Sequence, residues 1–188
     1  YASDLVKIAN SYYTNNSKFS YNSTTPCDFK NPSENINKWK VNGKYQIDDS
    51  CFLNYVLTGW TYDKSPYGNE KKTNNNRNNN VSWAIPSTRD EADIGKYFVQ
   101  KNWVVDVADL ETFKNLAIGD IIFMDADSKN NGHFMAISHT AIVVEKDKDG
   151  DYVALECTNG LSSGVFRKVK VKNLASKNIL FVGRFMIG

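Results

Sequence analysis

The chain has 188 residues, 41% of them hydrophobic, so it is long enough to bury one core, and we expect a single domain over 1–188. Its 23 basic and 21 acidic residues nearly balance, which removes the electrostatic argument for nucleic acid or an anionic membrane as partner. No apolar run approaches the roughly 20 residues that a membrane span needs. Because the chain begins at Tyr1, without Met or a signal-peptide pattern, we expect a processed or excised part of a longer protein.

The first predicted element is an amphipathic helix that has Ser3 or Asp4 as its N-cap and ends at 15–16. Its apolar residues recur at the helical spacing i, i+3, i+4 and i+7: Leu5, Ile8, Ala9 and Tyr12. Residues 17–44 are rich in turn-forming residues, and the pair Asn42-Gly43 predicts a short hairpin over 38–45.

The stretch 45–59 predicts a largely buried helix that starts near Asp48 or Asp49 and ends at Gly59. Two acidic residues stand at its start, and Cys51 follows within the first turn. A helix N-terminus presents unpaired N–H groups and a partial positive charge. This turn is therefore a favourable place for an anion or oxyanion site.

A long polar insertion is predicted at about 60–82, and its asparagine-rich part favours disorder over a functional loop. Thr88 and Glu91 form a capping-box pattern that opens a third helix. The buried row of this helix is Ile94, Tyr97 and Phe98, and residues 109–116 are expected to form a short helical piece.

From Gly119 onward the pattern changes to strands, at 120–124, 138–145, 152–156, 165–171 and 179–186. Successive strands with short turns favour an antiparallel sheet. Helices first and strands second predict an α+β fold, with N-terminal helices packed on that sheet.

Two strand ends carry the candidate catalytic pair. His139 opens the apolar strand 138–145, and Glu156 ends the next one, so a hairpin between them makes the two side chains cross-strand neighbours. A carboxylate beside an imidazole orients the ring and favours its cationic form. The alternatives are a polar strand-end histidine and a solvent-exposed edge glutamate, while His133, in a glycine-rich turn, is expected to be a solvated loop residue.

Metal sites are not indicated. The three cysteines, Cys27, Cys51 and Cys157, include no CxxC pair and do not make a disulfide framework, although an odd count can leave a free thiol. The acidic stretch 147–151 lacks the distal glutamate of a calcium loop and is expected to be a hairpin turn, and 125–130 is a loop. We expect no cofactor.

Four motifs, in this order, resemble the NlpC-type cell-wall peptidases of the papain-like cysteine hydrolase superfamily. They are Asp48-Asp49-Ser50-Cys51-Phe52, Gly119-Asp120-Ile121-Ile122-Phe123, Ser138-His139-Thr140-Ala141-Ile142 and Leu155-Glu156. The resemblance runs from about Tyr45 to the C-terminus without the insertion, and 38–52 also looks like phage tail-associated members. It implies a papain-like fold and acyl transfer by a nucleophile at a helix start, with His139 as general base and Glu156 orienting it. The Ser50 backbone N–H and Tyr21 would serve the oxyanion.

One position departs from the family pattern. Aligned through Asp48, Ser50 and Phe52, the nucleophile position is Asp49, and a carboxylate is a far poorer nucleophile toward an amide than a thiolate. Cys51 lies two residues further on, about 200° around the helix axis, and is expected to face the core. Three explanations compete: an introduced change in an active enzyme, a naturally inactive domain that binds cell-wall material, or a shifted helix start that makes Cys51 the nucleophile.

The resemblance thus implies a domain built to hydrolyse peptide or amide bonds of bacterial peptidoglycan, disabled by Asp49. It would belong to a phage tail or a secreted cell-surface protein, among other domains of a larger chain. The alternative is a non-catalytic or structural tail module that recognises wall glycan or teichoic acid, with stacking faces supplied by Trp39, Trp60 and Trp83.

Overall fold

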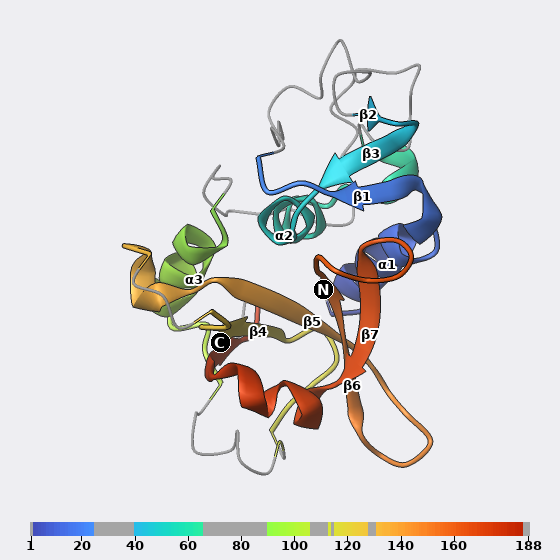
Figure 1. Ribbon diagram of the computed structural model, residues 1–188. Helices are drawn as coiled ribbons and strands as arrows, with labels where there is room; N and C mark the ends of the chain where they lie inside the picture. The colour runs from blue at the N-terminus through green and yellow to red at the C-terminus, as the bar shows by residue number, and fades with distance from the viewer. Residues whose placement is uncertain are drawn as a thin grey trace.

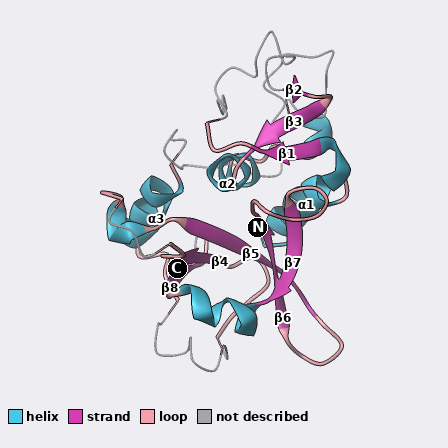
Figure 2. Ribbon diagram, viewed as in Figure 1, coloured by secondary structure: helices cyan, strands magenta, loops and turns pink. Residues whose placement is uncertain are grey.

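A computed structural model of the chain describes residues 2–24, 40–65, 90–105, 113, 115–127 and 131–185. They form an α+β fold with helices packed on an antiparallel sheet, which confirms the predicted class (Figures 1 and 2). The sheet has five strands in the order β7-β6-β5-β4-β8. Their bounds lie close to the predicted ones: β4 (Ile121–Met124), β5 (His139–Lys146), β6 (Tyr152–Cys157), β7 (Phe166–Lys170) and β8 (Ile179–Gly183).

Both faces of the large sheet are buried, which explains why its central strands read as continuous apolar runs. On β5, Ile142 and Val144 join the core under the helices, while Ala141 and Val143 join a second cluster on the opposite face. The 3-10 helix η6 (Val171–Lys177) contributes Val171 and Leu174 to that second cluster. β5 and β6 therefore have little freedom to slip, which fixes the positions of their end residues.

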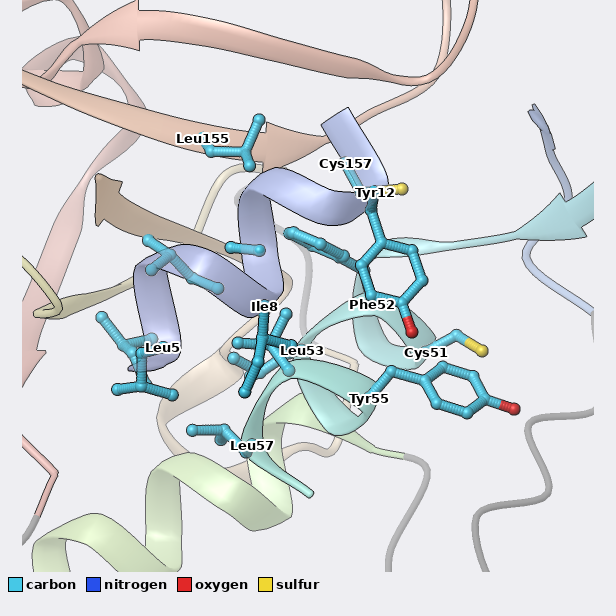
Figure 3. Close-up of a cluster of buried hydrophobic side chains, with 14 of the residues drawn as sticks. Leu5, Ile8, Tyr12, Cys51, Phe52, Leu53, Tyr55, Leu57, Leu155 and Cys157 are labelled. Atoms are coloured by element: carbon cyan, nitrogen blue, oxygen red, sulfur yellow. The ribbon is translucent and has the colours of Figure 1, made fainter. Parts of the chain in front are cut away.

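Helix α1 (Ala2–Tyr13) buries the predicted face, and Leu5, Ile8, Ala9 and Tyr12 are each at most 1% exposed. The predicted N-cap is wrong, because Ser3 and Asp4 lie inside the helix. Figure 3 shows Leu5, Ile8 and Tyr12 of α1 in one hydrophobic cluster with side chains of the following helix.

A three-stranded sheet of order β1-β3-β2 was not expected as a whole. The hairpin of β2 (Lys40–Val41) and β3 (Lys44–Ile47) confirms the prediction, and both turn residues, Asn42 and Gly43, have positive φ as a tight hairpin turn requires. The short strand β1 (Phe19–Tyr21) was missed, and it pairs parallel to β3.

Helix α2 (Asp49–Leu57) lies between the small sheet and β5 (Figure 1). It begins and ends as predicted, with Gly59 at φ +82° just beyond it. The predicted start of the polar insertion, at about residue 60, is too early. The first residues assigned to it are buried around the 3-10 helix η3 (Tyr62–Lys64): Trp60, Thr61, Tyr62 and Ser65. The rest of that insertion, from 66 on, lies outside the described residues.

Helix α3 (Glu91–Gln100) starts two residues later than predicted. Its N-cap is Asp90, whose carboxylate accepts the N–H of Ala92 at 2.9 Å, and Glu91 turns inward instead of capping. Ile94 and Phe98 are buried, whereas Tyr97 is only partly so. Thr88 and most of the predicted helical piece 109–116 lie outside the described residues.

Candidate active site

The site is built on the first turn of α2. Asp48 continues the extended backbone of β3 and caps the helix, its Oδ1 accepting the N–H of Cys51 at 2.8 Å. This cap sets the direction in which α2 starts. It leaves Asp49 as the first helical residue, with a side chain 13% exposed at the edge of the core.

His139, the first residue of β5, lies between two carboxylates. Its Nδ1 is 3.1 Å from Oδ2 of Asp49, and its Nε2 is 2.6 Å from Oε2 of Glu156. Only an imidazolium has a proton on both ring nitrogens, so only the cation satisfies both contacts. The strand pairing places His139 and Glu156 together as the sequence predicts.

Glu156 is held from its other side by a residue that sequence reasoning missed. Its side chain is fully buried, which excludes the solvent-exposed alternative, and Oε1 accepts the Nε–H of Arg167 at 2.6 Å. Arg167 lies directly opposite Glu156 in the β6–β7 pairing. The register of the β6–β7 hairpin is the signal that could have located Arg167.

Arg167, Glu156 and His139 form a row of ionisable side chains, and the pKa values of His139 and Glu156 are shifted by their neighbours in it. Burial alone would lower the pKa of His139, but hydrogen bonds and charges from Asp49 and Glu156 raise it to about 9. Burial would raise the pKa of Glu156, but the His139 and Arg167 contacts lower it to about 2. At neutral pH the row is therefore Arg167 cation, Glu156 anion, His139 cation.

The two expected oxyanion donors both bind Asp49. The N–H of Ser50 donates to Oδ1 of Asp49 at 3.0 Å, and the hydroxyl of Tyr21 donates to the same oxygen at 3.3 Å. Burial and the charge of Asp49 raise the pKa of Tyr21, so the phenol keeps its proton. Oδ1 of Asp49 thus accepts hydrogen bonds from both oxyanion donors, and Oδ2 contacts the His139 ring.

Glu91 is a further member that sequence reasoning assigned to a helix cap. It is 4% exposed, its Oε2 accepts the hydroxyl of Thr140 at 3.0 Å, and its N–H donates to Oγ of Ser50 at 3.3 Å. Burial, followed by the charge and hydrogen bond of Asp49, raises its pKa well above the ordinary value. Glu91 therefore keeps its proton to a higher pH than an ordinary glutamate does. Its position at the start of α3 gave no sequence signal beyond a capping pattern.

The structure does not bring Cys51 into this group. Cys51 is fully buried in the hydrophobic cluster, where Figure 3 shows it near Tyr55, and it is disulfide-bonded. A sulfur in that state is not available as a nucleophile. Cys157 is a free but buried thiol, whose pKa burial raises well above the ordinary value.

The remaining candidates lie away from the site. The side chain of His133 is 45% exposed and lies 3.4 Å from the carboxylate of Asp90, as expected for a loop residue. Trp60 is fully buried and offers no stacking face, while Trp39 and Trp83 lie outside the described residues. Within the described part of the chain, no group of three His, Cys, Asp or Glu side chains is arranged to hold a metal ion.

Asp49 and His139 open into a cleft of about 200 Å³. Its lining is polar and includes Tyr21, Ser138 and Asn159. Comparison of the chain with protein-family models, curated proteins and solved structures finds no match. None of the helices in the described residues is long and apolar enough to cross a membrane.

Proposed function

We propose that the chain is a peptidoglycan hydrolase domain of the NlpC-type, papain-like kind, disabled by an aspartate at the nucleophile position. The observation that carries this proposal is the position of His139, with Asp49 at a helix start on Nδ1 and Glu156 on Nε2. A nucleophile at a helix N-terminus, a base and an orienting carboxylate form the arrangement used for acyl transfer.

With a cysteine at position 49 the geometry supports a complete cycle. His139 takes the thiol proton, and the thiolate attacks the carbonyl carbon of a wall amide bond. The oxyanion is held by the Ser50 N–H and the Tyr21 hydroxyl, His139 gives its proton to the leaving amine, and a thioester remains. His139 then takes a proton from water, whose hydroxide releases the acid and restores the thiol.

Asp49 prevents this cycle for two reasons. Attack by its carboxylate would form an anhydride, which is a far less favourable intermediate than a thioester. Its oxygens also occupy the site, since Oδ1 takes both oxyanion donors and Oδ2 takes His139. The given chain therefore leaves amide bonds intact.

The test is a turbidity assay on purified bacterial cell walls. We expect the native chain to leave turbidity unchanged and Asp49→Cys to lower it, because the thiolate restores the missing group. The matched control is Asp49→Cys combined with His139→Ala, which keeps the thiol without its base and should be inactive. Lysis by the native chain, or no gain by a folded Asp49→Cys variant, refutes the proposal.

The alternative is a domain that binds wall polymer without cleaving it. It is favoured by the ionic hydrogen bonds that link Asp49, His139, Glu156 and Arg167 at the site. Each carboxylate oxygen of Asp49 and Glu156 has a donor, so these hydrogen bonds of the native site are complete without a substrate. We expect the native chain to co-sediment with purified walls, as part of a phage tail or secreted surface protein. If the native chain co-sediments with walls and Asp49→Cys gains no lytic activity, the result supports this alternative over a disabled hydrolase.

A further inference from the structure

A second hollow continues the site cleft along the small sheet. It has a volume of about 370 Å³ and lies between β1 and the loop 159–165, with Lys44 also in its lining. Tyr21 and Asn159 line both this groove and the cleft at Asp49. The two hollows therefore adjoin at these residues, and a ligand that reaches His139 is next to the groove.

The two walls of the groove are fixed to each other by one side chain. Oδ1 of Asn16 accepts the N–H groups of Val165 and Phe166 at 2.8 and 2.9 Å, and its Nδ2 donates to the carbonyl of Phe166 at 2.8 Å. Gly164, at φ +68°, packs so closely on Asn16 that a Cβ there would collide with it. Because Asn16 lies just before β1, the loop and the strand keep their spacing before any ligand binds.

The edge of β1 offers main-chain groups to the groove. Asn22 donates its N–H to the carbonyl of Ile47 on β3 at 3.0 Å. Since successive residues of a strand alternate in direction, the N–H and C=O of Tyr21 point to the opposite edge. Within the described strands β1 pairs only with β3, and the N–H of Phe19 already donates to Asn16, so Tyr21 is the residue of this edge that can pair with the backbone of an extended peptide.

The charge of the groove selects the kind of peptide. Lys44 is exposed and has no ion-pair partner among the described residues. The other described residues of the lining are uncharged, among them Asn159, Ser162 and Ser163. We propose that the groove binds an extended peptide segment of the wall polymer along β1, with a peptide carboxylate at Lys44. The identity of the peptide rests on the proposed function, whereas the strand edge and the charge do not.

Calorimetric titration of the native chain tests this inference with two probes. One is a soluble stem peptide released from peptidoglycan with free carboxylates, and the other is the same peptide with those carboxylates amidated. We expect the free form to bind two- to fivefold more tightly, the range of an exposed ion pair. Lys44→Gln should remove this difference, and Lys148→Gln, in the distant β5–β6 turn, should retain it.

A second variant tests the groove without changing charge. Ser162→Trp places a large ring in the groove from an exposed loop position and should weaken both peptides at least tenfold. Gln100→Trp, at the exposed end of α3, is the matched control and should bind like the native chain.

Equal binding of the two peptides by the native chain, or no binding of either, overturns the groove proposal even if Asp49→Cys cleaves walls. Lys44-dependent binding of a glycerol-phosphate oligomer in place of the peptide also overturns it. If Asp49→Cys is inactive but binding of the free-carboxylate peptide depends on Lys44, the groove proposal stands. In that case only the proposal of a disabled hydrolase fails.

Discussion

At the scale of single residues, the site is organised by one carboxylate with four neighbours. Asp49 meets the Ser50 N–H, the Tyr21 hydroxyl, the His139 ring and Glu91, whose pKa is raised. Each of these neighbours can donate a hydrogen bond to an anion. A thiolate at the same position would receive the same hydrogen bonds.

The first prediction concerns the charge of His139. We expect NMR titration to give a pKa of about 9, because Asp49 and Glu156 stabilise the imidazolium. Asp49→Asn should lower that pKa, since one of the two charges is removed. His133→Gln assigns the signals of the two histidines, and an ordinary or lowered pKa for His139 in the native chain contradicts the account.

The second prediction concerns the proton on Glu91. Its pKa is raised in the folded state, so its contribution to stability is present below the unfolded value of 4.5 and declines as the pH rises above it. Glu91→Gln keeps a donor for Asp49 and an acceptor for Thr140 without that pH-dependent loss. We expect urea unfolding to show Glu91→Gln gaining stability relative to the native chain between pH 4 and pH 7.

Glu91→Ala is the matched comparison. It leaves the Thr140 hydroxyl and Asp49 without their buried partner, and we expect a loss of about 1–3 kcal/mol in the free energy of unfolding. If the alanine and glutamine variants unfold alike at pH 7, Glu91 does not hold the proton assigned to it.

At the scale of elements, strand register decides which side chains meet. The β6–β7 pairing sets Arg167 opposite Glu156, and β5 and β6 bring His139 to the other oxygen of that carboxylate. Breaking a buried pair leaves an uncompensated charge, whereas an exposed pair contributes little.

The third prediction compares two neighbours on β7. Arg167→Gln should lower the free energy of unfolding by about 2–4 kcal/mol, because buried Glu156 loses its charged donor. Lys168→Gln, which breaks a surface pair with Glu145, should cost about 1 kcal/mol or less. Equal losses, measured by chemical denaturation at pH 7, would mean that Arg167 does not compensate the charge of buried Glu156.

The sequence predicted the elements that have a strong period and missed those that depend on tertiary pairing. The apolar spacing of α1, the Asn42-Gly43 turn and the run 141–144 each identified an element locally. β1 has three residues and is defined only by pairing with β3, so no local pattern marks it. Glu91 and Arg167 were missed for the same reason, since long-range packing alone turns them toward Asp49 and Glu156.

At the scale of the whole molecule, the shifted pKa values of His139 and Glu156 make the free energy of unfolding depend on pH. The pKa of His139 rises from 6.5 to about 9 on folding, so its stabilisation is complete below 6.5 and is lost as the pH rises through 9. The pKa of Glu156 falls from 4.5 to about 2, so its stabilisation is complete above 4.5 and is lost as the pH falls through 2. Both contributions are complete between pH 4.5 and 6.5.

The fourth prediction is a maximum of thermal stability in that window. We expect the melting temperature to decline on both sides of it, with the alkaline decline reduced in His139→Gln, which has no proton to lose. Calorimetric scans from pH 3 to pH 10 measure this. Two outcomes contradict the link between His139 protonation and stability. One is a native melting temperature that does not change between pH 6.5 and 9, and the other is an equal alkaline decline in His139→Gln and the native chain.

The central claim is that residue 49 faces His139 as a catalytic nucleophile would. The most direct test is the pH dependence of alkylation of Asp49→Cys by iodoacetamide, followed by mass spectrometry. The native chain is the control for the buried thiol of Cys157. A thiol at a helix start beside an imidazolium should react with an apparent pKa well below the ordinary value of about 8.5. A profile at or above that ordinary value would show that position 49 does not face His139 as a nucleophile.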